Sequence, residues 1–143
     1  LITYIYFIRG FILIGGLFRN YLLKIISLIA IIATIFLIAY DIISLSSTSA
    51  ETEYIAGASA LTFGIIGIIF GASLLRLQKS VGTASTLAGI IEIIAGCFLL
   101  TIILAFVGLI LYLPAELVEI IIIFKVLEII RDKQKSVALN QTE

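Results

Sequence analysis

The chain has 143 residues, of which 62% are hydrophobic and 13% are charged, with nine basic and nine acidic side chains and a mean hydropathy of +1.31. A soluble domain is about 45–50% apolar and about 25% charged, so this composition predicts an integral membrane protein. The sequence contains no His, which argues against haem, zinc or copper held by imidazole. We expect no cofactor, no metal and no nucleic-acid partner.

Long apolar runs predict an all-α helical bundle, because a helix needs about 20 apolar residues to cross the hydrocarbon core. The four expected transmembrane helices form one domain and cover about 22–45, 54–75, 83–106 and 107–130, before a solvated, frayed cytoplasmic tail at 131–143. The start of the fourth helix is open. Pro114 followed by Glu116 is typical of a helix start, so this helix begins near Leu113, or near Val107 with a bend at Pro114.

The first 18 residues are apolar apart from Arg9 and are short for a transmembrane helix. They are expected either to end a fifth crossing that begins upstream or to lie in the interface with Arg9 reaching the headgroups. We favour the crossing, because both faces of the segment are apolar. The first residue is Leu and the sequence has no Met, so residues upstream of Leu1 are expected to be missing.

Basic residues predict the orientation, since Lys and Arg are retained on the cytoplasmic side during insertion. They gather before the first clear transmembrane helix, between the second and third, and after the fourth, at Arg19, Lys24, Arg76, Lys79, Arg131, Lys133 and Lys135. The opposite segment, 46–53, has no basic residue. We therefore expect a multi-pass protein of the cell membrane with its C-terminus in the cytoplasm.

Small residues recur at steps of three and four in the second and third transmembrane helices, which is the spacing of a helix-packing face. The two series are Gly57, Ala60, Gly64, Gly67 and Gly71, and Gly82, Ser85, Gly89, Glu92 and Gly96. Close packing in lipid depends on small residues. We expect these faces to meet in a tight antiparallel hairpin, with Ile68 on the opposite face.

The two series also resemble a repeat. A shift of 25 residues places GIIGIIFGASLL, at 64–75, on GIIEIIAGCFLL, at 89–100, with eight of twelve positions identical. An Ile-rich chain produces matches by chance, so duplication of a helical element and coincidence both remain open.

Glu92 lies about ten residues into its helix, near mid-membrane, where an ionised carboxylate costs several kcal/mol unless it is paired or hydrated. One interpretation is a proton or cation relay. The other is a Glu that bonds a neighbouring polar group and fixes the helix register, with Arg9 or Lys125 as an ionic partner. The other acids of the apolar segments are expected near the outer helix ends, in interfacial or capping roles: Asp41, Glu116 and Glu119.

The segments LFRNYL, at 17–22, and TLAGIIEIIAGCFLLTIILAFVGLIL, at 86–111, resemble small uncharacterised multi-span membrane proteins of archaea and bacteria. The resemblance implies a prokaryotic membrane location and no activity. The glycine-rich hairpin with its polar loop, RLQKS at 76–80, and its mid-membrane Glu92 also looks like a rotary ATPase proteolipid. It departs from that pattern in lacking the alternate-residue glycine run and the Pro after the loop.

The sequence shows neither a Ser/His/Asp set nor a paired-carboxylate headgroup site, so we do not expect an enzyme. The leading interpretation is a non-catalytic membrane subunit that packs against other transmembrane subunits or copies of itself, surrounded by membrane lipid. The alternatives are a small proton or cation channel or carrier that uses Glu92, and a structural membrane protein of a virion.

Overall fold

A computed structural model describes residues 2–44, 49–101 and 104–140 and is all-helical there, which confirms the predicted fold class. The helices are α1 (Ile2–Leu17), α2 (Tyr21–Ser44), α3 (Ser49–Leu75), α4 (Gln78–Val81), α5 (Thr83–Leu100) and α6 (Ala105–Asn140). Four of them are long and apolar enough to cross a membrane, over Tyr21–Tyr40, Tyr54–Leu75, Thr83–Leu100 and Ala105–Val137. The chain is a multi-pass integral membrane protein with a helical bundle.

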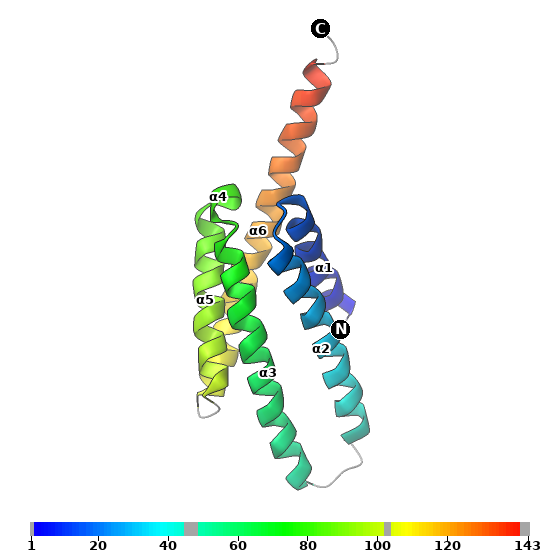
Figure 1. The fold of residues 1–143 in the computed structure, drawn as a ribbon, viewed down its shortest axis with the longest axis vertical. Coiled ribbons are helices and arrows are strands. Elements are labelled where there is room, and N and C mark those ends of the chain that lie inside the picture. Colours follow the sequence, from blue (N-terminus) through cyan, green and yellow to red (C-terminus); the bar gives the residue numbers. More distant parts are fainter. Residues whose placement is uncertain (1, 45–48, 102–103, 141–143) are drawn as a thin grey trace.

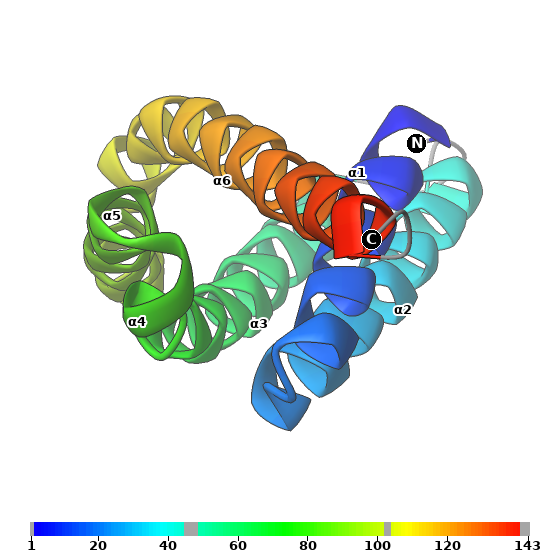
Figure 2. The same cartoon turned by 90° about the horizontal axis from the view of Figure 1, so that it is seen from above.

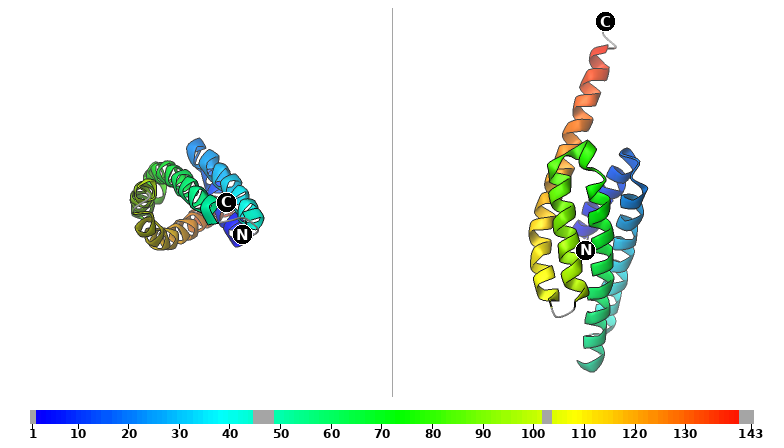
Figure 3. Two further views of the ribbon diagram at one scale, coloured as in Figure 1. Left: turned by 90° about the horizontal axis from the view of Figure 1, so that it is seen from below. Right: turned by 60° about the vertical axis from the view of Figure 1, so that its left-hand side comes forward.

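The bundle has two parts, and the second part packs against α3 of the first. Helices α3, α5 and α6 form a curved row in which α5 packs against both of its neighbours (Figures 1 and 2). Helices α1 and α2 form a second hairpin, in which α2 packs on α3 and α1 touches α6 (Figure 3). The α1–α2 turn, α4 and the last part of α6 lie towards one end of the molecule. The basic segments around Arg19, Arg76 and Arg131 therefore share that end.

The third and fourth transmembrane helices differ from their expected bounds. Helix α5 already ends at Leu100, and α6 begins at Ala105 and continues through Pro114. The expected fraying of the tail at 131–143 was wrong over 131–140, because α6 stays helical to Asn140, although the side chains of residues 131–137 are exposed as a solvated tail requires. Residues 131–140 contain no Gly or Pro and several strong helix formers, so nothing local ends the helix at the membrane surface. Three parts of the predicted segments lie outside the described residues: residue 45 of the first transmembrane helix, residues 102–103 of the third, and residues 141–143 of the tail.

The N-terminal segment packs inside the bundle, alongside α2 rather than across its end (Figure 1). Phe11 is fully buried and meets Phe70 of α3 edge-on, with ring centroids 5.2 Å apart. Gly15 lets the two helices of this hairpin approach, because a Cβ there would lie 2.9 Å from the backbone nitrogen of Lys24. One apolar face of α1 is thus used for helix packing, whereas Tyr6, Leu13 and Leu17 are exposed.

The outer surface has the character that a bilayer requires. Large apolar side chains such as Tyr21, Phe36 and Phe106 are each 73% exposed, which a soluble protein of this size would not tolerate along its whole length. The fully buried side chains, by contrast, gather where the two parts of the bundle meet, and include Phe11, Leu23, Leu74, Leu77 and Ile122. Lipid is the solvent for the outer faces.

Candidate functional site

The floor of the site is the contact between α3 and α5, where glycines face each other in pairs. A Cβ built on Gly64 would lie 2.9 Å from the carbonyl oxygen of Gly96, and one on Gly96 would lie 2.7 Å from the carbonyl oxygen of Gly64. Gly71 and Gly89 stand in the same reciprocal relation, at 2.6 and 2.7 Å. These distances are shorter than real Cβ contacts, so only glycine permits this backbone approach.

The pairing has an approximate twofold symmetry. The 25-residue shift that relates the two apolar motifs carries Gly64 onto Gly89 and Gly71 onto Gly96. Because Gly64 faces Gly96 and Gly71 faces Gly89, the shift exchanges one contact with the other. The repeated motifs are therefore arranged around a local axis perpendicular to the two antiparallel helices.

The repeat is broken at the centre of this arrangement, where Gly67 on α3 corresponds to Glu92 on α5. A Cβ on Gly67 would lie 3.4 Å from Oε2 of Glu92 and would collide with the hydroxyl of Tyr112 on α6. The missing side chain of one repeat thus makes room for the carboxyl group of the other. Gly67 therefore leaves space for the carboxyl group of Glu92 in addition to its role in helix packing.

Other residues of the small-residue series depart from the expected packing face. Gly57 has no neighbour within 4 Å of its Cβ position, because α3 extends beyond the end of α5 at that point (Figure 1). Ala60 is half-buried. Ile68, expected on the opposite face, lies against Gly96, whose Cβ position is 2.9 Å from Cγ1 of Ile68. The spacing of the small residues predicts which face of the helix is packed. It does not predict how wide that face is or where along the helix the packing ends.

Gly82 and Ser85 organise the start of α5. Gly82 adopts a positive φ of 84° between α4 and α5, so it serves the turn, and its Cβ position lies 3.2 Å from Nζ of Lys125 rather than on α3. The hydroxyl of Ser85 is fully buried and donates a hydrogen bond to the carbonyl oxygen of Leu74. This bond ties the beginning of α5 to the end of α3.

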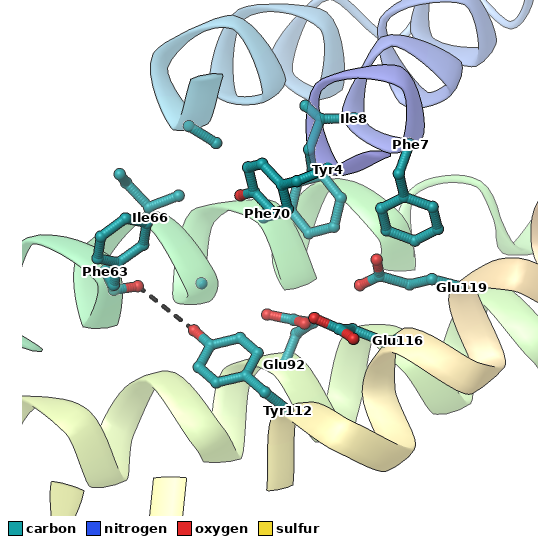
Figure 4. Close-up of a pocket in the computed structure, with 12 residues that line it drawn as sticks. Tyr4, Phe7, Ile8, Phe63, Ile66, Phe70, Glu92, Tyr112, Glu116 and Glu119 are labelled. Atoms are coloured by element: carbon teal, nitrogen blue, oxygen red, sulfur yellow. Dashed lines mark hydrogen bonds between the residues drawn. The ribbon is translucent and has the colours of Figure 1, made fainter. Parts of the chain in front are cut away.

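Glu92 borders a cavity of about 80 Å³ at the centre of the bundle (Figure 4). Its side chain is only 4% exposed. Every helix of the described residues except the short α4 contributes to the wall, which is lined by Tyr4, Phe7, Ile8, Ala30, Phe63, Ile66, Gly67, Phe70, Glu92, Tyr112, Glu116 and Glu119. The acids lie on the α5 and α6 side, opposite the aromatic and aliphatic side chains of α1 and α3.

The structure adds a second buried acid that the sequence did not identify. Glu119 is 3% exposed and its carboxyl group lies within hydrogen-bonding reach of the carboxyl group of Glu92. The expected interfacial role of Glu119 was therefore wrong. Since α6 begins at Ala105, Glu119 lies about 21 Å along the helix, deep in the transmembrane segment. Glu116 also reaches the cavity but is exposed at its rim. Asp41 lies near the end of α2, and its side chain is not described.

Among the described residues no basic side chain balances the pair, since the cavity lining contains neither Lys nor Arg there. Lys125, one expected partner of Glu92, lies near Gly82 instead, and Arg9 is exposed on α1. Oε1 of Glu119 is buried and accepts no hydrogen bond. Two adjoining carboxyl groups repel each other when both are ionised, whereas one shared proton removes the repulsion and supplies the missing donor.

Two tyrosines, Tyr4 and Tyr112, also line the cavity, and the hydroxyl of Tyr112 donates a 3.4 Å hydrogen bond to the carbonyl oxygen of Phe63 (Figure 4). Among the described residues, no three His, Cys, Asp or Glu side chains are arranged to hold a metal ion.

A second cavity adjoins the first between α1 and α6. It has a volume of about 310 Å³ and is lined by Thr3, Tyr4, Phe7, Glu116 and Ile120. Three of these residues, Tyr4, Phe7 and Glu116, also line the central cavity. Glu116, which is exposed, is therefore the acid shared by both cavities.

No protein-family model matches the chain, and neither a curated protein nor a solved structure matches it. The function is therefore inferred from the geometry of the site itself.

Proposed function

We propose that the protein is a small proton channel or proton-coupled carrier in which Glu92 and Glu119 bind and release a proton within the membrane. The observation that carries this proposal is the pair itself: Glu92 and Glu119, 4% and 3% exposed, adjoin one another beside a cavity in whose lining the structure describes no basic residue. Acids at this depth are costly and are typical of ion pathways. A purely structural Glu would need one polar partner rather than a second acid and an adjoining cavity.

Glu116 supplies the connection to the outside in this proposal. It lines both cavities, so a proton leaving Glu119 meets a further carboxyl group three residues away on the same helix, at the cavity between α1 and α6. The cavities have room for several water molecules between these carboxyl groups. The small size of the central cavity favours a proton over a hydrated cation.

The orientation follows the basic residues. We place the end of the bundle that carries Arg19, Arg76 and Arg131 in the cytoplasm, because basic residues near transmembrane helices stay on that side. The C-terminal part of α6 then projects into the cytoplasm as a continuous helix. The cavity between α1 and α6 lies within the membrane part of this arrangement.

Proton flux into vesicles tests the proposal. Purified protein is reconstituted into vesicles that contain a pH-sensitive dye, and an external pH step is applied with the membrane potential clamped. The parent protein should carry protons faster than empty vesicles, and Glu92→Gln and Glu119→Gln should reduce the flux to the level of empty vesicles. Gln keeps the size and hydrogen bonding of the side chain, so both variants should remain folded by circular dichroism.

Glu128→Gln is the matched control, because Glu128 is an exposed acid on the same helix as Glu119, outside both cavities. It should transport like the parent. Parent flux equal to that of empty vesicles, or unchanged flux in both buried variants, would rule out the proposal. Na⁺ or K⁺ flux that depends on Glu92, without proton flux, would assign a cation pathway instead.

A second candidate function is that of a non-catalytic subunit packed against other transmembrane helices. The observation that favours it is the end of α3, where Gly57 faces open space while Gly64 and Gly71 of the same series are packed. A glycine on an open helix face permits a further helix to approach. Mass measurement in mild detergent tests this candidate, which requires an oligomer or a copurifying partner; a lone monomer contradicts it.

A further inference from the structure

A separate polar pocket lies at the basic end of the bundle. It has a volume of about 280 Å³ and is formed where the α1–α2 turn meets the turn that follows α3. Its polar and basic lining comprises Arg19, Asn20, Tyr21, Arg76 and Ser80. We propose that this pocket binds the phosphate-containing headgroup of an anionic phospholipid.

The pocket is held in place by Asn20, which is 9% exposed. Its Nδ2 donates a 2.8 Å hydrogen bond to the carbonyl oxygen of Ser73, and its Oδ1 accepts a 3.2 Å hydrogen bond from the backbone nitrogen of Leu23. The first bond fixes the α1–α2 turn to α3, and the second caps α2. Arg19 and Arg76 are thereby brought to one pocket from segments far apart in the sequence.

The charge of the pocket fits an anion. Two arginines line it, and the described lining contains no Asp or Glu. Arg binds phosphate through paired N–H groups, and it does so more selectively than Lys. The first backbone N–H groups of α2 add partial positive charge, because the pocket includes Tyr21 and Leu22 of its first turn.

The depth of the pocket fits a lipid rather than a free anion. The candidate transmembrane segment of α2 begins at Tyr21 and that of α3 ends at Leu75, so the pocket lies at the level where headgroups begin. Below it, α2 presents Tyr21, Ile25 and Leu28 to the outside, at 73%, 56% and 52% exposure. These side chains offer a surface for acyl chains directly under the headgroup.

Native mass spectrometry of the purified full chain with added lipid tests the proposal. Phosphatidylglycerol and phosphatidylcholine with identical acyl chains are compared at equal concentration, and one phosphatidylglycerol molecule should be retained preferentially. Arg19→Gln with Arg76→Gln should weaken its binding by about 25-fold, since each basic side chain near the membrane surface is worth about fivefold in affinity. Arg131→Gln with Lys133→Gln removes the same charge outside the pocket and should bind like the parent.

Equal retention of the two lipids, or equal losses in the two double variants, would overturn the proposal. Inorganic phosphate that displaces phosphatidylglycerol at equal concentration would show a site for free anions and would also overturn it. If the double Gln variant fails to fold, Arg76→Gln alone and Arg19→Lys with Arg76→Lys decide the question. The single variant should lose about fivefold, and the Lys variant should keep more binding than the single variant.

Discussion

Adding one methyl group at Gly71 should separate α3 from α5, whereas the same change at Gly57 should not. A Cβ at Gly71 would lie 2.6 Å from the carbonyl oxygen of Gly89, and a backbone atom can yield only if the helix moves. A Cβ at Gly57 meets nothing within 4 Å. Both substitutions gain about 0.5–1 kcal/mol from the helix preference of Ala over Gly. That gain cancels in the comparison, so the difference between the variants is the overpacking cost of about 1–3 kcal/mol.

The free energy of unfolding of Gly71→Ala and Gly57→Ala can be compared by titrating detergent-solubilised protein with a denaturing detergent and following helicity by circular dichroism. We expect Gly71→Ala to be less stable than Gly57→Ala by about 1–3 kcal/mol. Gly89→Ala, with its Cβ 2.7 Å from the carbonyl oxygen of Gly71, should behave like Gly71→Ala. Equal stability of Gly71→Ala and Gly57→Ala would refute the close packing of α3 on α5.

Three further predictions concern other contacts. Gly67→Ala should destabilise the bundle because its Cβ collides with the hydroxyl of Tyr112. Tyr112→Phe removes that oxygen and should restore part of the stability in the double variant. If the free-energy changes of the two single variants simply add in the double variant, in the same unfolding assay, the contact would be contradicted. Asn20→Ala should cost about 1–3 kcal/mol, because it removes a helix cap and leaves a buried carbonyl oxygen of α3 without its donor; an unchanged unfolding midpoint would contradict this. Ser136→Cys in a Cys97→Ser background should react with an impermeant maleimide only after cells are opened, and labelling of intact cells would reverse the proposed orientation.

The helical period of the small residues was sufficient to predict which faces of α3 and α5 carry Gly64, Gly71, Gly89 and Gly96. Spacings of three and four residues are a local property of a helix, so they can be read without knowing its neighbours. The position at which a partner helix ends depends on the rest of the fold, so it is not a local property. Gly57 follows the same period as Gly64 but lies beyond the end of α5, so its role could not be read from spacing.

The partner of Glu92 was missed for a different reason. The sequence left two starts open for that helix, and only the start near Leu113 puts Glu119 close to a helix end, whereas α6 begins at Ala105 and continues through Pro114. One signal was available: Ala115, Glu119, Ile122 and Val126 follow steps of four, three and four, and all four are buried. That series puts Glu119 on the packed face of α6.

The central claim is that the Glu92–Glu119 pair exchanges a proton, and infrared difference spectroscopy of the reconstituted protein during a pH step tests it most directly. A protonated carboxyl group has a carbonyl band that an ionised carboxylate lacks. With the pH step kept above about 6, where ordinary exposed carboxyl groups stay ionised, the parent protein should gain this band on the step to lower pH and lose it on return, Glu119→Gln and Glu92→Gln should each remove the change, and Glu128→Gln should retain it. A carboxyl band that stays constant over that pH range would contradict the claim and leave the pair a structural contact.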